Sequence, residues 1–284
     1  MFFRAASVVL LLLSFNFVWG IKPLNYTLAG LIVIWLGVSI RGMASMRSQV
    51  FGRVYWRGEC TPSPTVALTF DDGPSEPSTA QVLDALKRHG VKATFFVIGR
   101  NLKAHPELAR RIVDEGHELG NHSYSHPWMF RMLFSRIRED IELCQDEIEK
   151  VAGYRPRFFR QPIGMNNPSV MKIVGAMGMV MVGWQVRAYD AVPTAKEKIA
   201  RRILCGVKPG GIILLHDGCD GKTNPDRSAT VEALEEIIPE LKKRGYEFKT
   251  VSELLGIENV CHSREGGNPG ISGCRPERSR GTHS

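Results

Sequence analysis

Short apolar runs alternate with amphipathic stretches between Pro64 and Gly256. The runs that predict strands are Thr65–Phe70, Ala93–Ile98, His117–Asn121, Arg157–Arg160, Val180–Gln185, Gly211–His216 and Tyr246–Val251. Stretches with apolar residues three and four positions apart predict helices over Thr79–His89, Pro106–Glu115, Ser135–Val151, Pro168–Met177, Thr194–Cys205 and Ser228–Arg244. This alternation indicates an α/β fold with a parallel sheet of about seven strands.

A barrel is at least as well supported by this pattern as an open, doubly wound sheet. In parallel barrels the chemistry lies at the carboxyl ends of the strands. Ionisable residues end or directly follow four of the predicted strands: Asp71 and Asp72, then His122, Arg160 and His216. We therefore expect these side chains to share one edge of the sheet.

Two apolar runs precede this domain, over residues 5–20 and 24–40. Neither clearly reaches the roughly 20 residues that span a bilayer comfortably. A retained membrane anchor of one or two helices within residues 1–45 is favoured over a cleaved signal peptide, since no small-residue cleavage site follows Trp19. If both runs span, the basic stretch after them places the domain in the cytoplasm; if one spans, the domain faces outward.

The positive charge belongs mainly to this flank. The chain carries a formal charge of +8, of which residues 1–60 contribute +5 and residues 61–256 only +2. A nearly neutral main domain argues against a nucleic-acid partner. The predicted organisation is an anchor over 1–45, a basic linker over 46–63, the catalytic domain over 64–256 and a disordered tail over 257–284. Unpaired Cys144, Cys205 and Cys219 lean weakly towards a reducing compartment.

Three of the polar residues have the composition of a catalytic metal site. An Asp-Gly turn such as that after Asp72 is commonly just a solvated turn. His122 and His126, however, are four residues apart and would face the same side of a helical turn. With Asp72 they would supply two nitrogens and one oxygen, leaving positions open for water and substrate. Asp71 would remain free as a base.

Two further residues suit an amide hydrolase. His216 ends an apolar strand, and a protonated histidine can donate the proton that a departing amine needs. Arg160 could hold a carboxylate in a bidentate grip. Alone, each could equally be structural: a histidine at a barrel mouth or an arginine in a salt bridge at its rim.

Five segments taken in order resemble the motifs of a known family. Thr69–Pro74, His122–His126, Arg160–Gly164, Trp184–Asp190 and Leu214–His216 are similar to those of the polysaccharide deacetylases, the NodB homology domain or carbohydrate esterase family 4. The resemblance implies a distorted (β/α) barrel, a divalent metal that is usually zinc, and removal of N-acetyl groups from GlcNAc-containing glycans or of O-acetyl groups from xylan.

The resemblance also implies a role for each matching residue. Asp71 would be the general base, oriented by Arg160, and His216 the general acid, tuned by Asp190. The metal ligands would be Asp72, His122 and His126. Trp184 and Leu214 would line the pocket for the acetyl methyl group, and the backbone N–H of Ile163 would help to hold the oxyanion.

The sequence departs from the family at the substrate side of the site. Ile163 stands where Tyr is common, Arg187 where Asp is frequent, and Ala191 where Trp is frequent. These departures leave the predicted metal site and base unchanged.

From the motifs and the apolar flank we expect a membrane-anchored N-deacetylase acting on an envelope polysaccharide or a lipid-linked glycan. The alternatives are an O-acetyl esterase, a deformylase acting on envelope sugars, or a catalytically inactive sugar-binding module. A closed structural metal site would need a fourth ligand, which is not evident.

Overall fold

A curled sheet of parallel strands forms the centre of the protein in the computed structural model, which describes residues 22–59, 63–220 and 226–261. The strands of this sheet are β1 (Val54–Tyr55), β2 (Thr65–Asp71), β3 (Thr94–Val97), β4 (Glu118–Asn121), β6 (Phe158–Phe159), β7 (Val180–Val182), β8 (Val186–Arg187), β9 (Gly211–His216) and β10 (Glu247–Phe248). A separate antiparallel pair joins β5 (Tyr154–Arg155) to β11 (Val260–Cys261).

The strands lie in the order β1-β7-β6-β4-β3-β2-β9-β8, with β10 paired to the start of β2. All pairings in this sheet are parallel, which confirms the expected distorted barrel. The expectation of about seven strands omitted β1 and β8, each two residues long. Among the described residues no ladder joins these two ends, and an isolated antiparallel bridge links Arg57, just after β1, to Gly211 at the start of β9.

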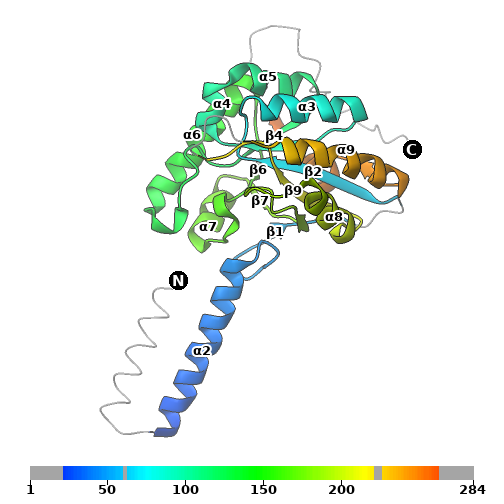
Figure 1. Cartoon of the computed structure of the whole chain (residues 1–284). Coiled ribbons are helices and arrows are strands. Elements are labelled where there is room, and N and C mark those ends of the chain that lie inside the picture. The colour runs from blue at the N-terminus through cyan, green and yellow to red at the C-terminus, as the bar shows by residue number, and fades with distance from the viewer. Residues whose placement is uncertain (1–21, 60–62, 221–225, 262–284) are drawn as a thin grey trace, which may run out of the picture.

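Helices cover the outside of the sheet (Figure 1). They are α3 (Ser78–His89), α4 (Gly99–Ala104), α5 (Pro106–Asp114), α6 (Phe134–Ala152), α7 (Pro168–Ala176), α8 (Lys196–Gly206), α9 (Ser228–Lys243) and α10 (Val251–Leu255), with single 3-10 turns at Met129–Arg131 and Pro162–Gly164. All six predicted helices are present. The sequence pattern missed α4 and α10, which are too short to show a period.

Alternation along the strands separates the outer core from the interior of the barrel. On β2, Val66, Leu68 and Phe70 pack with the covering helices. Ala67 faces the other way and joins Phe96, which lies on β3, in an interior cluster closed by Val251 of α10. Because side chains alternate, Thr69 and Asp71 face the interior as well. The base of the barrel is therefore filled, and its polar residues lie at the opposite end.

Helix α2 (Lys22–Ala44) stands out from the domain and meets it at its C-terminal end (Figure 1). Its segment Tyr26–Ala44 is long and apolar enough to cross a membrane, and only 6% of that window is buried. The earlier apolar run, residues 5–20, lies outside the described residues.

The stretch expected to be a basic linker packs as part of the domain. Met46 and Val54 are buried in a cluster with residues of α7 and β7, and β1 pairs with β7. Similarly, the first residues of the expected tail form β11, while residues 262–284 lie outside the described part. Cys144, Cys205 and Cys219 are free thiols.

Candidate active site

The predicted acid and base lie side by side because of strand register. Asp71 of β2 is directly opposite His216 of β9. Alternation places Leu214 on the same face of β9 as His216. Both strands end here, so the two ionisable groups lie at the carboxyl edge of the sheet, as the sequence pattern predicted.

Arg160 fixes the carboxylate of Asp71. Its Nη1 donates to Asp71 Oδ1 at 2.7 Å and to Thr69 Oγ1 at 2.8 Å, and its Nη2 donates to the carbonyl oxygen of Gly183 at 3.0 Å. Arg160 is completely buried. Burial lowers the pKa of Arg160, and the charge of Asp71 opposes that shift. The guanidinium stays charged in this setting, so Asp71 has a fixed orientation and a permanent cationic partner.

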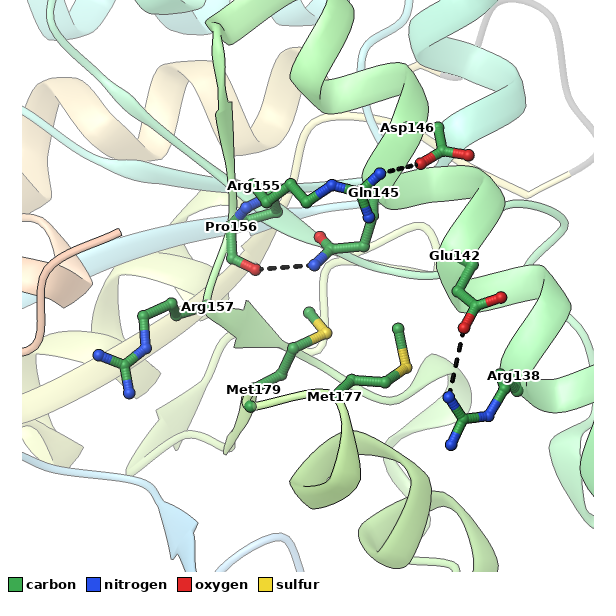
Figure 2. A pocket seen from close by; sticks show the side chains of 10 residues that line it. Arg138, Glu142, Gln145, Asp146, Arg155, Pro156, Arg157, Met177 and Met179 are labelled. Carbon is green, nitrogen blue, oxygen red and sulfur yellow. Dashed lines mark hydrogen bonds and ion pairs between the residues drawn. The ribbon is translucent and has the colours of Figure 1, made fainter. Parts of the chain in front are cut away.

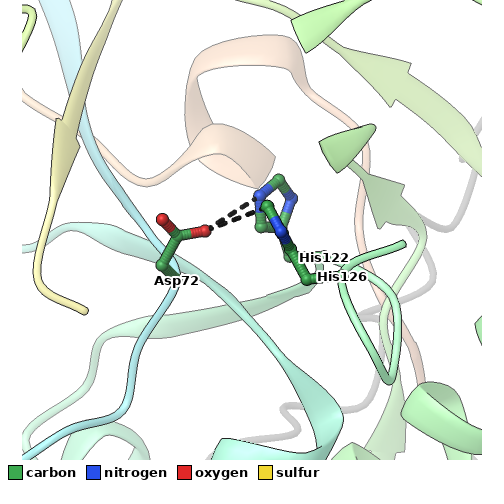
Figure 3. Close-up of side chains that lie close together, drawn as sticks. All are labelled: Asp72, His122 and His126. Atoms are coloured by element: carbon green, nitrogen blue, oxygen red, sulfur yellow. Dashed lines mark ion pairs between the residues drawn. The ribbon is translucent and has the colours of Figure 1, made fainter. Parts of the chain in front are cut away.

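Asp72, His122 and His126 converge as the sequence predicted (Figure 3). Asp72 Oδ1 lies 3.4 Å from His122 Nε2 and 3.3 Å from His126 Nε2. The three ligand atoms all lie within 4.8 Å of one another. Asp72 reaches this position through a left-handed backbone with φ of 75°, which turns it away from its neighbour Asp71.

Both histidines direct Nε2 towards Asp72. His122 Nδ1 lies 2.7 Å from the carbonyl oxygen of Arg160, and this contact turns Nε2 towards Asp72. Burial would lower the pKa of His122, but the charges of Asp71 and Asp72 prevail and raise it. A divalent cation bound between the three side chains would take the place of the proton on Nε2. Burial, reinforced by the charge of His122, lowers the pKa of His126 to about 4, so His126 is neutral at pH 7. Two imidazole nitrogens and one carboxylate oxygen fit a divalent cation such as zinc.

Electrostatics keep Asp72 ionised. Burial alone would raise the pKa of the Asp72 carboxyl, but the hydrogen bond and charge of His122, with the nearby His216 and His126, outweigh it and hold the pKa well below its ordinary value. The site therefore combines an ionised carboxylate with imidazoles at close range, which makes it a possible metal site.

His216 is held by Asp190 from the loop after β8. Its Nδ1 lies 2.9 Å from Asp190 Oδ1, and its backbone N–H donates to Asp190 Oδ2 at 2.9 Å. Thr230 donates to the same Oδ2. Burial would lower the pKa of His216, but the charge of Asp190 and its hydrogen bond prevail and raise it to about 9. His216 is therefore an imidazolium at pH 7.

The three residues assigned to the substrate lie around this centre. Ile163 has a left-handed backbone, with φ of 66°, and 43% of its surface is exposed. Trp184 packs against Gly164, where an added Cβ would lie 2.4 Å from the indole ring. Leu214 is buried, with 4% exposed. A β-branched residue with positive φ is a true conformational outlier, and such strain gathers at functional sites.

Sequence reasoning missed several supporting residues. Asp220 Oδ2 lies 3.3 Å from His126 Nδ1, and Arg100 forms an ion pair with Asp220. Asn101 donates to the backbone carbonyl of Asp72. Arg227 donates to the backbone carbonyl of Asp190. These residues lie outside the five motifs, and only the fold brings them to the site.

A cavity of about 700 Å³ opens elsewhere, beside α6 and β5 (Figure 2). Its charged side chains are largely paired, Arg138 with Glu142 and Arg155 with Asp146. It shares no residue with the catalytic cluster, so it is not part of the site.

Comparison with known proteins agrees with this geometry. Residues 58–182 match the family model described as polysaccharide deacetylase. A peptidoglycan-N-acetylglucosamine deacetylase from Bacillus cereus is 40% identical over 192 residues, covering 67% of this chain and 87% of the relative.

Two crystal structures are similar in fold. A peptidoglycan N-acetylglucosamine deacetylase in complex with a hydroxamate (an N-hydroxybenzamide) has a TM-score of 0.68 at 34% identity, covering 72% of this chain and 94% of the other. A family 4 acetyl xylan esterase from Clostridium thermocellum in complex with a cobalt ion has a TM-score of 0.61 at 44% identity, covering 67% and 89%. The chain is a hydrolase that belongs to the polysaccharide deacetylase family, carbohydrate esterase family 4.

Proposed function

We propose that this chain is anchored in a membrane by α2 and removes N-acetyl groups from a GlcNAc-containing glycan of the cell envelope, either a polysaccharide or a lipid-linked glycan. The observation that carries the proposal is the pairing of Asp71, at the end of β2, with His216, at the end of β9. Asp71, held by Arg160, lies opposite a protonated His216 and next to the three possible metal ligands. A base, an acid and a cation site are the parts that amide hydrolysis needs.

Asp72, His122 and His126 would hold the metal, for which zinc suits the ligand set. Bound there, a divalent metal would polarise the acetyl carbonyl and make water more acidic. Asp71 accepts the proton of the attacking water, since Arg160 holds its carboxylate in a fixed orientation. The backbone N–H of Ile163 donates to the developing oxyanion.

His216 completes the reaction. It gives its proton to the departing amine nitrogen, and Asp190 stabilises the imidazolium until then. Leu214 and Trp184 form the apolar surface against which the acetyl methyl group packs. The complete set of acid, base and cation ligands favours an enzyme over an inactive sugar-binding module, which would need no open metal site.

The test is release of acetate and formate by the full-length protein from GlcNAc oligomers, peptidoglycan, xylan and polyprenyl-linked sugars, with and without zinc. We expect acetate from GlcNAc substrates, lost with chelator and restored by zinc. Asp71→Asn should reduce the rate by about 10²- to 10⁴-fold, and His126→Ala should abolish it. Formate release alone, or acetate only from xylan, would favour the alternative activities. A chelated enzyme with undiminished rate would refute the metal mechanism.

A further inference from the structure

Exposed apolar side chains gather around the edge of the sheet that carries the active site. In the described part of the chain, the large hydrophobic residues exposed outside α2 follow the carboxyl ends of β4, β6 and β8, apart from Val50 and Leu143. They are Trp128, Phe130, Leu133, Phe134, Ile163, Tyr189 and Val192. A surface that contacts only water rarely exposes so many large apolar side chains in one region. Such a patch beside an active site marks an interaction surface.

The densest part is residues 127–138, here called the rim segment. Trp128 is 59% exposed and Leu133 75%. The rim segment also holds three arginines, Arg131, Arg136 and Arg138, and no acidic residue of its own. Arg136 and Arg138 are paired with Glu139 and Glu142, which follow on α6. Aromatic and aliphatic side chains mixed with cations are typical of segments that lie in the headgroup region of a membrane.

Leu133 occupies a helix position that does not favour leucine. It is the N-cap residue of α6, and its side chain makes no capping hydrogen bond. Asp, Asn, Ser or Thr at this position would stabilise the helix, by about 1 kcal/mol relative to an apolar residue. An exposed leucine that costs helix stability indicates a use outside the helix.

The rim segment is tied to the end of the candidate membrane helix by two neighbouring asparagines. Asn166 Nδ2 donates to the carbonyl oxygens of Gly42 and Ser45 at the end of α2. Asn167 Nδ2 donates to the carbonyl oxygen of Met129 in the rim segment, at 3.3 Å. Met46 and Met129 also share one buried cluster. The exit point of α2 and the rim segment are therefore parts of one packed unit.

The same unit touches the catalytic residues. An added Cβ at Gly183 would lie 2.4 Å from the carbonyl oxygen of Met46, and the carbonyl oxygen of Gly183 accepts the Nη2 hydrogen bond from Arg160. The chain leaving α2 thus reaches the carboxyl edge of the sheet, and not the filled base of the barrel.

We propose that the rim segment lies on the surface of the bilayer that α2 spans, so that the mouth of the active site opens towards the lipid headgroups. The substrate is then an N-acetylated glycan carried by a membrane lipid, rather than a free polymer. This inference rests on the proposed anchoring and deacetylation. The bilayer is favoured over a second protein because the rim segment is packed against the end of α2, the helix proposed to span that bilayer.

Photocrosslinking of the full-length protein in nanodiscs containing anionic lipid tests the contact directly. A diazirine amino acid replaces Leu133 in the rim segment or, as the matched control, Leu143, which is 44% exposed on α6. We expect lipid adducts from position 133 and none from position 143, measured by mass spectrometry. Protein–protein adducts from position 133, or no lipid adduct there, would overturn the proposal. This result is independent of catalysis.

A kinetic comparison tests the consequence for the substrate. Leu133→Asp supplies a favourable N-cap, so the fold should be retained. We expect kcat/KM to fall about tenfold for a GlcNAc-bearing polyprenyl phosphate lipid in nanodiscs, as loss of one inserted leucine implies. Hydrolysis of a soluble GlcNAc oligomer should not change, and Leu143→Asp should alter neither. Equal loss on both substrates would contradict membrane presentation, whereas a wild-type protein inactive on both would contradict the proposed deacetylation instead.

Discussion

Asp220 is a positioning residue for the metal site. Its Oδ2 lies 3.3 Å from His126 Nδ1, on the side of the ring away from Asp72, and so favours the ring orientation that directs Nε2 to Asp72. Mutating a residue that contacts a metal ligand, but not the metal itself, commonly weakens metal affinity 10- to 100-fold. Because the Asp220 side chain is 40% exposed, we expect Asp220→Ala to weaken zinc binding by about tenfold, at the low end of that range.

Competition with a chromophoric chelator measures this affinity without reference to activity. Glu236→Ala removes the same charge from the exposed surface of α9 and should leave the zinc dissociation constant unchanged. An Asp220→Ala protein that binds zinc as tightly as the wild type would show that His126 needs no such partner.

The pH dependence of hydrolysis should report the pair of His216 and Asp190. In the proposed reaction His216 can act as an acid only while protonated, and its pKa is raised to about 9. Activity should therefore fall as pH rises through about 9. Asp190→Asn removes the charge that opposes the effect of burial, so the alkaline limb of kcat/KM should move to lower pH.

Thr230→Val is the matched control for this shift, since it removes one hydrogen bond to Asp190 and keeps the carboxylate. Its alkaline limb should stay close to that of the wild type. If Asp190→Asn left the limb in place, the charge of Asp190 would not set the pKa of His216.

For single residues, the sequence could predict which side chains are reactive but not the backbone conformation that orients them. The described non-glycine residues with positive φ are Asp72, Ser123, His126, Ile163 and Tyr189, and all follow the carboxyl ends of strands. Asp and His adopt this conformation more often than most residues, but the side chains of Ser123, Ile163 and Tyr189 do not favour it, so the surrounding packing imposes it. The left-handed backbone at Asp72 and the contact of Asp220 with His126 could therefore be found only from the fold.

Among the elements, those with long periodic patterns were predictable. The face of α6 that carries Ile137, Ile141 and Ile148 is buried as its spacing requires. The two-residue strand β1 and the six-residue α4 carry no pattern long enough to detect. Their positions depend on contacts with distant segments, as with β1 against β7.

The junction of β3 and β4 gives a pH-dependent stability. His117 Nδ1 accepts from the backbone N–H of Ala93 at 3.2 Å, and burial lowers the pKa of His117 from 6.5 to about 4. In the unfolded chain His117 is therefore protonated below pH 6.5, whereas in the folded chain it stays neutral down to about pH 4. Stability contributed by neutral His117 is present above pH 6.5 and lost as pH falls, by up to about 3 kcal/mol.

Urea unfolding of the full-length protein in detergent and chelator measures this contribution. His117→Asn keeps an acceptor near the Nδ1 position and cannot be protonated. The difference in free energy of unfolding between wild type and variant should therefore shift against the wild type between pH 6.5 and 4. All other ionisable groups are the same in the two proteins, so their contributions cancel in the difference. A difference independent of pH would exclude His117 as the source.

For the whole molecule, the uneven charge and the apolar run indicated a membrane anchor, but not its attachment to the domain. The arginines Arg47, Arg53 and Arg57, between the apolar run and the first predicted strand, predict a basic linker. In the fold, Arg53 and Arg57 lie over the rings of Tyr55 and Trp56, and Met46 enters the core. Cationic side chains at a membrane surface can pack in this way on aromatic rings, so charge alone does not identify a flexible connection.

The rigid attachment of α2 depends on Asn166. Its backbone N–H donates to the carbonyl oxygen of Met43 at 2.9 Å, and its side chain donates to the carbonyl oxygens of Gly42 and Ser45 at 3.1 and 2.7 Å.

Asn166→Leu keeps the size of the side chain and removes both side-chain hydrogen bonds, which should cost about 1–3 kcal/mol. Hydrogen exchange of residues 42–48 in nanodiscs should then accelerate roughly tenfold to hundredfold. Asn259→Leu makes the same substitution at an asparagine that bonds to Arg157 and Glu118, and it should leave that exchange unchanged. Equal exchange in Asn166→Leu and wild type would mean that the buried methionines alone hold the helix to the catalytic edge.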